Sequence, residues 1–281
     1  MSTVTVTKAS GEQEPYDESK LRNSLAKAGA SQKVIDPIAK AIRQELYEGI
    51  TTQEIYQKAF QKLQMRSKRS AGRYKLKNAI MELGPTGFPF EKFVGGLLGR
   101  LGYSTQIGVT VEGKCVSHEI DVIAEKNDEY FMIECKFHNR KGLKCNVQVP
   151  LYIQSRFLDV EKKLKTHSGH DDQHPQAWLV TNTKFTSDAL QYGECMGIKM
   201  LSWDYPQGNG LKELIDRVNL HPLTCLSSLS KKDKHQLLER DIVFCKDLIE
   251  DKKLLKKAGI SSNKTDAVLK EAVAICNHEI E

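Results

Sequence analysis

The sequence of 281 residues lacks several features that mark whole classes of protein. No run of apolar residues is long enough to span a bilayer, and the N-terminus lacks the basic, then apolar, then small-residue pattern of a secretion signal. The seven cysteines are scattered without a CxxC pair, which argues against the common zinc and redox motifs. We therefore expect a cytoplasmic protein with reduced thiols and no membrane partner.

Charge and composition give weaker guidance than these absences. The formal net charge is +6 and the isoelectric point is near 8.8, a mild bias that permits a polyanionic partner without requiring one. The sequence contains no internal repeat and no low-complexity tract. Its length and its apolar fraction of 40% suit two or three modest domains, each with a core of its own.

Residues 117–138 concentrate the charged groups that suggest chemistry. They read as two extended runs joined by a turn at 127–128, with Asp121 on the first run and Glu134 and Lys136 on the second. Because side chains alternate along a strand, these three groups should share one polar face of a hairpin. The intervening positions of the second run are apolar and should be buried: Phe131, Ile133, Cys135 and Phe137.

This grouping of charges has a specific chemical use. Two carboxylates can hold Mg²⁺ or Mn²⁺, hard cations that prefer oxygen ligands and keep several waters. A lysine beside them can orient or deprotonate the attacking water and can steady a phosphate oxygen. Hydrolysis of a phosphodiester is the reaction that this set suits, whereas the alternative is a surface hairpin with solvated charges.

The pattern of Asp121 followed by Glu134-x-Lys136 resembles the PD-(D/E)xK nuclease superfamily, and the stretch from Gly84 to Asp204 resembles its Mrr-type restriction endonuclease branch. Ile120 replaces the proline of the superfamily motif, a departure that removes no ligand. The resemblance implies a metal-dependent DNA endonuclease of a restriction or DNA-processing type. Asp121 and Glu134 would be metal ligands and Lys136 a catalytic group.

The resemblance also implies supporting residues around this motif. An acidic residue on the helix before the first strand often joins the metal site, and Glu91 occupies that place, although a first-turn acid favoured by the helix dipole is an equal alternative. His138 lies beyond Lys136 on the polar face and could touch phosphate. A polar residue on the helix that starts near Gln148 often supports the site, which makes Gln154 and Arg156 candidates for supporting the site and for contacting DNA.

Residues 62–77 contain seven lysines or arginines and no acid. A helix with this content, crossing from the first domain into the second, could lie along DNA phosphates with Arg69 and Arg73 among the contacts. A solvated helix face is an equally good interpretation of the same pattern.

The first 83 residues read as a small hairpin followed by a helical bundle. Val4 and Val6 alternate with polar residues as a short strand, and Asp17 can cap a first helix. Asp36-Pro37 is expected to start a second helix. Thr51 and Glu54 have the spacing of a capping box for a third helix.

This order of elements resembles an ATP-cone, a nucleotide-sensing module, through VTKASGEQEPYDESKL, ITTQEI and RYKLKNAI. In that family two lysines, an acidic residue and a threonine contact the nucleotide, and the matching positions are Lys8, Glu14, Lys20 and Thr52. Ammonium groups and a helix N-terminus are good partners for phosphates. Ala9 stands where the family usually has a basic residue, so binding of ATP or dATP could be weaker or altered. A helical domain that merely positions the nuclease is the alternative.

The remaining chain, from residue 221, predicts three short helices. The turn at 257–260 faintly resembles a helix-hairpin-helix, which would offer backbone N–H groups to DNA phosphates, and a packing or dimerisation bundle is at least as good an interpretation. We expect a multi-domain α/β protein with a cone over 1–83, a restriction-endonuclease-like mixed sheet flanked by helices over 84–220, and a helical bundle over 221–281.

The expected function is a Mg²⁺- or Mn²⁺-dependent DNA endonuclease regulated by ATP or dATP, acting as a homodimer if it cuts both strands. The alternative is a nucleotide-responsive DNA-binding regulator whose nuclease fold does not turn over. The intact Asp121, Glu134 and Lys136 argue against that alternative.

Overall fold

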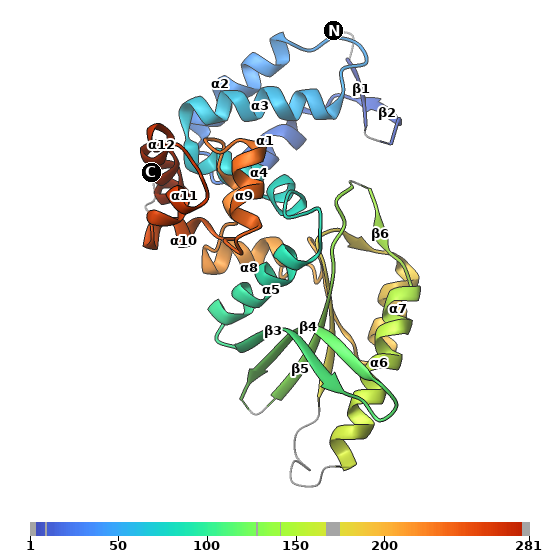
Figure 1. Cartoon of the computed structure of the whole chain (residues 1–281). Coiled ribbons are helices and arrows are strands. Elements are labelled where there is room, and N and C mark those ends of the chain that lie inside the picture. Colours follow the sequence, from blue (N-terminus) through green and yellow to red (C-terminus); the bar gives the residue numbers. More distant parts are fainter. Residues whose placement is uncertain (1–3, 9, 128, 141, 167–174, 277–281) are drawn as a thin grey trace. The chain divides into compact units, whose positions relative to one another are not determined.

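The computed structural model describes residues 4–8, 10–127, 129–140, 142–166 and 175–276. The chain divides into two compact units, coloured along the sequence in Figure 1. The first unit combines the chain up to Asn78 with residues 225–234 and with the segment from Cys245 onward. The second comprises Ala79–Thr224 and His235–Phe244. Across the described residues, no helix is both long and apolar enough to cross a membrane.

The N-terminal part of the first unit is the expected hairpin and helical bundle. The hairpin pairs Val6 with Glu14, and Gly11 in its turn has a positive φ of 84°, a conformation that glycine adopts without steric cost. The elements are β1 (Thr5–Thr7), β2 (Gln13–Pro15), α1 (Glu18–Lys27), α2 (Gln32–Gln44), α3 (Thr52–Arg66) and α4 (Lys68–Met81).

Helix starts in this unit test the capping predictions. The Asp17 side chain accepts a hydrogen bond from the Ser19 N–H, and Thr51 and Glu54 form the predicted capping box at the start of α3. The prediction for α2 was wrong, because the helix begins at Gln32 and contains Pro37 in its interior. Ile35, which is only 1% exposed, lies in the part of α2 before the proline, so core burial favours the earlier start over the local cost of Pro37.

Within residues 221–276, the described part of the C-terminal region, four α-helices follow a 3-10 turn, one helix more than predicted. The elements are η1 (Leu223–Cys225), α9 (Lys231–Leu238), α10 (Cys245–Glu250), α11 (Lys253–Lys257) and α12 (Ser262–Cys276). Gly259, with φ +76°, makes the predicted turn between α11 and α12. A Cβ added to Gly72 of α4 would lie 2.5 Å from Ile275 Cδ1, so the missing side chain lets α12 approach α4 closely.

The second unit is built on a five-stranded mixed sheet in the order β3-β4-β5-β7-β9. The first three strands are antiparallel, whereas β7 and β9 run parallel to β5. Figure 1 shows α6 and α7 along one side of this sheet and α5 and α8 along the other. The elements are α5 (Phe88–Arg100), β3 (Ser104–Glu112), β4 (Ser117–Lys126), β5 (Glu129–Lys136), β6 (Lys144–Cys145), α6 (Gln148–Thr166), β7 (Gln176–Thr181), β8 (Lys184–Phe185), α7 (Ser187–Cys195), β9 (Lys199–Leu201) and α8 (Leu211–Val218).

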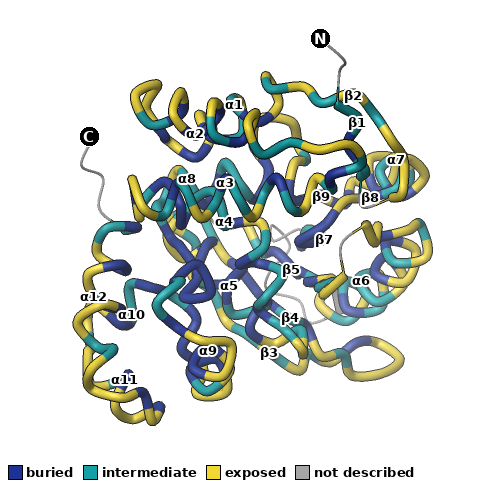
Figure 2. The backbone as a smooth tube through the Cα atoms, turned by 90° about the horizontal axis from the view of Figure 1, so that it is seen from above, coloured by how far each residue is buried: buried dark blue, intermediate teal, exposed yellow. Residues whose placement is uncertain are grey.

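The expectation that one face of the β4–β5 hairpin is polar was wrong, because side chains on both faces of the sheet are buried. Met132 lies on the side expected to be polar, yet it is only 5% exposed and packs with Ile123 and with Val160 of α6. Figure 2 shows buried colouring along the central strands. Helices on both sides therefore leave the charged groups at the ends of the strands rather than along an open face.

Asp159 of α6 stabilises the turn between β3 and β4 through hydrogen bonds. Its carboxylate accepts hydrogen bonds from the backbone N–H groups of Cys115 (3.0 Å) and Val116 (3.3 Å), and lies 2.9 Å from His118 Nε2. These bonds, led by that of His118, lower the pKa of Asp159 to about 2. The contact ties the helix to the far end of the β3–β4 hairpin.

Replacing Asp159 with alanine should lower the melting temperature by a few degrees near neutral pH, because two backbone donors and His118 lose their acceptor. A lowered pKa stabilises the fold above the ordinary carboxyl pKa of 3.8, and that contribution disappears as pH falls from there towards 2. Thermal unfolding at pH 7 and at pH 3 checks this result. Glu125→Ala, on an exposed position of β4, is the control, and equal melting temperatures for the two variants would contradict the prediction.

Candidate functional site

The site begins where the β4–β5 ladder ends. The last paired residues are Val122 and Ile133, so continuation of the register would bring Asp121 opposite Glu134. There, the Asp121 carboxylate Oδ2 accepts the Cys135 backbone N–H at 2.7 Å. The structure thus brings Asp121 and Glu134 together on neighbouring strands, as the sequence motif predicts.

The end of β5 is fixed against β7 by residues that the sequence motif did not include. Thr181 pairs with Lys136, and its hydroxyl donates to the Lys136 carbonyl at 2.7 Å. Asn182, which is 1% exposed, accepts the His138 N–H and donates to the His138 carbonyl, both at 2.8 Å. The polar Thr-Asn-Thr run directly after a buried strand is the sequence signal that could have found these positioning residues.

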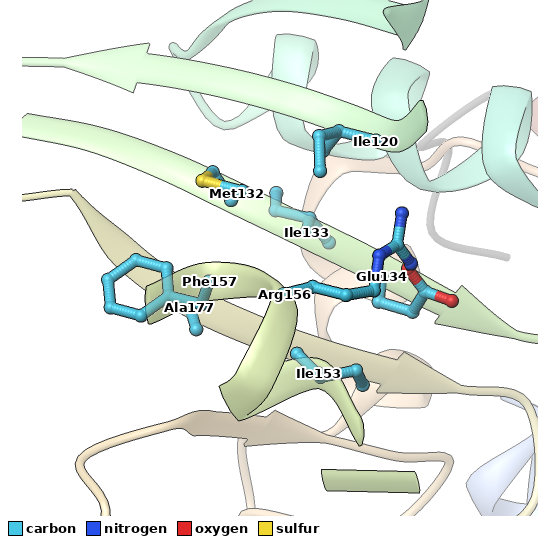
Figure 3. A pocket seen from close by; sticks show the side chains of 8 residues that line it. All are labelled: Ile120, Met132, Ile133, Glu134, Ile153, Arg156, Phe157 and Ala177. Carbon is cyan, nitrogen blue, oxygen red and sulfur yellow. The ribbon is translucent and has the colours of Figure 1, made fainter. Parts of the chain in front are cut away.

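Arg156 of α6 forms an ion pair with Glu134. Its Nη1 donates to Glu134 Oε2 at 2.6 Å, and its Nη2 donates to the Glu119 carbonyl. The guanidinium carbon lies 5.5 Å from the centre of the Tyr152 ring. Figure 3 shows the side chain reaching from the helix to the Glu134 carboxylate. In this structure Arg156 therefore contacts a candidate metal ligand, while its predicted contact with DNA stays a prediction.

A narrow pocket lies beside this ion pair. Its volume is about 20 Å³, which is room for about one water molecule, and Figure 3 shows its mostly apolar lining. The lining residues are Ile120, Met132, Ile133, Glu134, Ile153, Arg156, Phe157 and Ala177. Low-polarity walls strengthen the electrostatic interactions of the Glu134–Arg156 pair.

Glu91 is brought to the same end of the sheet by aromatic packing. Phe90 and Phe137 have ring centres 5.7 Å apart, which brings the start of α5 against the end of β5. Burial raises the pKa of Glu91 to about 7, and the nearby carboxylates of Asp121, Glu119 and Glu134 add to the rise. The surroundings of Glu91 therefore favour its protonated form far more than those of an ordinary glutamate do.

The carboxylates of Asp121 and Glu134 are also held in an environment that disfavours their charge. Burial is the largest cause of a raised pKa for both groups, and Asp121 adds to the rise at Glu134. The Cys135 N–H and Arg156 oppose the rise at Asp121, while Arg156 and Lys136 oppose it at Glu134. A bound cation would relieve this crowding of negative charge.

The donor set fits a hard divalent cation through two carboxylates. Among the described residues, no three His, Cys, Asp or Glu side chains gather as closely as a full protein cage requires. The second oxygens of Asp121 and Glu134 accept no hydrogen bond from the described part of the protein. Mg²⁺ is commonly bound by one or two carboxylates and completes its shell with water, so this arrangement is adequate.

The other predicted contacts lie in different surroundings. Burial, and then Lys136, lowers the pKa of His138, which favours a neutral imidazole near the site. Gln154 lies on α6 and is only 8% exposed. In the first unit Arg69 and Arg73 belong to α4, which starts after a break at Ser67, so the basic stretch is not one continuous helix. The Nε atoms of both arginines are buried, which leaves less of them for phosphate than an open helix face would.

The first unit places the predicted nucleotide contacts in one cluster. Glu14 pairs with Lys8 at 2.8 Å and with Lys20 at 2.9 Å, so one carboxylate joins the two lysines. Thr7 forms a parallel bridge with Thr51, which brings Lys8 close to Thr52 at the start of α3. Two ammonium groups therefore lie near a helix N-terminus, an arrangement suited to phosphate. Ala9 lies outside the described residues.

Comparisons with known families match three successive stretches of the chain. Residues 4–81 match the ATP cone domain, residues 85–207 match a restriction endonuclease domain of the Mrr catalytic type, and residues 221–276 match the C-terminal domain of AF1548-like proteins. The chain combines these three modules, and the matches confirm the cone and nuclease resemblances.

Individual relatives extend this match beyond single domains. An uncharacterized protein of Archaeoglobus fulgidus is 39% identical over 180 residues, which cover 63% of this chain and 95% of the relative. The crystal structure of AF1548, a protein of unknown function, is 35% identical with a TM-score of 0.57, covering 68% of this chain and 98% of that one.

A weaker likeness, at 18% identity and a TM-score of 0.33, links 72% of this chain to 53% of Can2 from Sulfobacillus thermosulfidooxidans, solved with cyclic tetra-adenylate. At that distance neither ligand nor activity transfers. The identity to the Archaeoglobus fulgidus protein across nearly all of that relative places this chain in the same family, a family of AF1548-like proteins that carries a restriction endonuclease domain of the Mrr type.

Proposed function

We propose that this chain is a metal-dependent endonuclease that hydrolyses DNA phosphodiester bonds. The most direct support is the hydrogen bond from the Cys135 N–H to the Asp121 carboxylate, which joins the ends of β4 and β5 beside Glu134. Lys136 follows two residues after Glu134. The restriction endonuclease match over residues 85–207 gives this chemistry its context. Two crowded carboxylates and an exposed ammonium are the groups that hydrolysis of a phosphodiester requires.

Each residue has a role in this proposal. Asp121 and Glu134 would hold Mg²⁺ or Mn²⁺, and Glu91 would be a nearby acidic group outside the ligand pair. The ion, when bound, supplies Lewis acidity at a phosphodiester oxygen. Lys136 orients the attacking water and stabilises negative charge on the phosphate, and Arg156 holds the Glu134 carboxylate in place. Asn182 and Thr181 keep the end of β5 aligned so that Lys136 faces the substrate.

Nucleotide binding at the cone would regulate this activity. Lys8, Lys20 and Thr52 would contact the phosphates of ATP or dATP, and Glu14 would release the lysines to the ligand as binding occurs. A chain with one nuclease domain makes one cut per active site, so cutting of both strands favours a homodimer.

The test of the nuclease proposal is nicking of supercoiled plasmid, methylated and unmethylated, by the full chain. Mg²⁺ or Mn²⁺ should support conversion to open-circular or linear DNA, and EDTA should stop it. Linear product that grows more than linearly with protein concentration would support the dimer. Salt-dependent DNA binding without cutting on either plasmid would instead favour a DNA-binding regulator with an inactive nuclease fold.

The paired change Lys8→Ala with Lys20→Ala should weaken ATP binding by about 100-fold, because two charge-assisted phosphate contacts are lost. Calorimetric titration of the full chain with ATP and with dATP measures the effect. Lys27→Ala, at the other end of α1, removes one lysine outside the cluster and should leave affinity unchanged. Equal affinities for the double variant and wild type would show that Lys8 and Lys20 do not bind the nucleotide phosphates.

A further inference from the structure

A second and larger cavity lies within the nuclease unit. Its volume is about 570 Å³, within the range of pockets that bind small molecules. It is bordered by the end of α5, by β7 and β9, and by α8 with the segment before it. None of the nuclease residues Glu91, Asp121, Glu134 and Lys136 lines it.

The cavity and the Glu134 side chain lie on opposite faces of the sheet. Glu134 pairs with Leu179, which packs in the core under α6 and α7. Trp178 is one residue earlier on β7, so its side chain points to the other face, where it lines the cavity together with Lys199 of β9. A ligand in the cavity would therefore not occupy the metal site.

Positive charge dominates the rim of the cavity. Lys126, Lys199 and Arg217 line it, and in the described part of the chain no carboxylate lies within ion-pair distance of any of the three. Glu194 is the one carboxylate among the lining residues, and it accepts the Tyr205 hydroxyl at 2.8 Å. Lys126 donates to the Leu101 carbonyl and Arg217 to the Asn209 side chain, both at 2.8 Å, and these acceptors are neutral. The cavity therefore offers positive charge that no described carboxylate neutralises to an anionic group.

Aromatic rings lie beneath two of these lysines, and two of the rings, Tyr103 and Trp178, line the cavity. The Lys199 Nζ lies 5.0 Å from the centres of both the Phe131 and Trp178 rings, and the Lys126 Nζ lies 4.8 Å from the centre of the Tyr103 ring. Trp178 is 9% exposed, and its Nε1 has no hydrogen-bond partner among the described residues. A flat apolar body can pack against the accessible edges of Tyr103 and Trp178 and against the leucine and methionine side chains that also line the cavity.

We propose that this cavity binds a small organic anion with a flat aromatic body, of about the size of a mononucleotide. The volume sets the size, the rings select a flat apolar body, and Lys126, Lys199 and Arg217 select negative charge. The site is separate from the nuclease centre and from the cone, so it gives the nuclease domain a ligand site of its own.

The test uses the full chain with Trp203→Phe, which leaves Trp178 as the sole tryptophan of the two in the sequence. The probes are 8-anilinonaphthalene-1-sulfonate and its uncharged analogue N-phenyl-1-naphthylamine, followed through the loss of Trp178 fluorescence. The sulfonate should bind saturably and at least about tenfold tighter than the uncharged probe, because only it can pair with the rim cations. Displacement by AMP would identify nucleotides as members of the ligand class.

Charge reversal at the rim decides whether the cavity selects anions. Lys199→Glu with Arg217→Glu should lower sulfonate affinity about tenfold or more and should remove the preference over the uncharged probe. Lys212→Glu reverses a charge on the same helix as Arg217 but outside the cavity lining, and it should change neither. Equal binding of the two probes to wild type, or unchanged sulfonate affinity in the double variant, would overturn the proposal. Plasmid nicking by the double variant reports separately on the nuclease site.

Discussion

Replacing Lys136 with alanine should lower the rate of Mg²⁺-dependent plasmid nicking by about 1,000-fold, within the range that a positioned catalytic group contributes. Lys136 is exposed at the end of β5, and no described carboxylate pairs with its ammonium group. Its charge is close enough to Asp121 and Glu134 to oppose the rise of their pKa values. The loss should therefore fall on the chemical step.

Because Lys136 is exposed, its replacement tests catalysis with little effect on folding. Removing an exposed lysine usually changes stability little, so the variant should fold and bind DNA like wild type. Lys162→Ala, at an exposed position of α6, controls for the loss of one positive charge from the nuclease unit. Single-turnover nicking at saturating protein separates the cleavage rate from binding. Nicking by the Lys136 variant at more than a tenth of the wild-type rate would exclude Lys136 from catalysis.

Asp121→Asn is the companion change at the carboxylate. Asparagine keeps an oxygen that can accept the Cys135 N–H, so the strand junction should persist, while the charge that would hold a cation is lost. We expect nicking to fall about as far as with Lys136→Ala, because both groups act at the same step. Restoration of cutting by higher Mn²⁺ in Asp121→Asn but not in Lys136→Ala would assign the metal to Asp121.

Local signals in the sequence were sufficient for much of the fold. Alternation along residues 117–138 predicted the two strands, and the spacing of Thr51 and Glu54 predicted the start of α3, because both depend on nearby residues alone. The start of α2 was missed, since burial of Ile35 outweighs the local preference of Pro37. The burial of Met132 was missed for the same reason, because it depends on α6 covering the sheet.

The candidate site shows the same division between local and tertiary information. The motif identified Asp121, Glu134 and Lys136, and the resemblance offered Arg156 as a supporting residue. Neither indicated that Arg156 would pair with Glu134, 22 positions earlier in the chain. The support of His138 by Asn182 spans 44 positions. Such contacts arise when parallel strands and a crossover helix pack, and a single sequence contains only the polar residue types as a hint.

The ion pair between Arg156 and Glu134 gives the second large expectation. Arg156→Met keeps the apolar stem and removes the charge, leaving Glu134 buried beside Asp121 without its cation. At pH 7 this change should cost about 2 kcal/mol of unfolding free energy and lower the melting temperature by several degrees. Nicking should fall by at least about 100-fold, because a carboxylate that remains protonated holds a cation poorly.

The pH dependence of this loss has a definite sign. Burial and Asp121 already raise the pKa of Glu134 above its ordinary value of 4.5, and removal of Arg156 raises it further. A group with a raised pKa in the folded state destabilises the protein when it must ionise, so the loss grows as pH rises above 4.5 and through the folded-state pKa. The variant should therefore approach wild-type stability near pH 4 and depart from it towards pH 7.

A double variant separates the ion pair from the packing of the arginine stem. In Glu134→Gln with Arg156→Met neither partner carries charge, so at pH 7 this chain should be more stable than Arg156→Met alone. Urea unfolding of wild type, both single variants and the double variant at pH 4 and pH 7 gives the coupling between the two sites. A coupling near zero at pH 7 would show that Arg156 stabilises the unit through its contacts with Tyr152 and the Glu119 carbonyl, and that Glu134 does not depend on it.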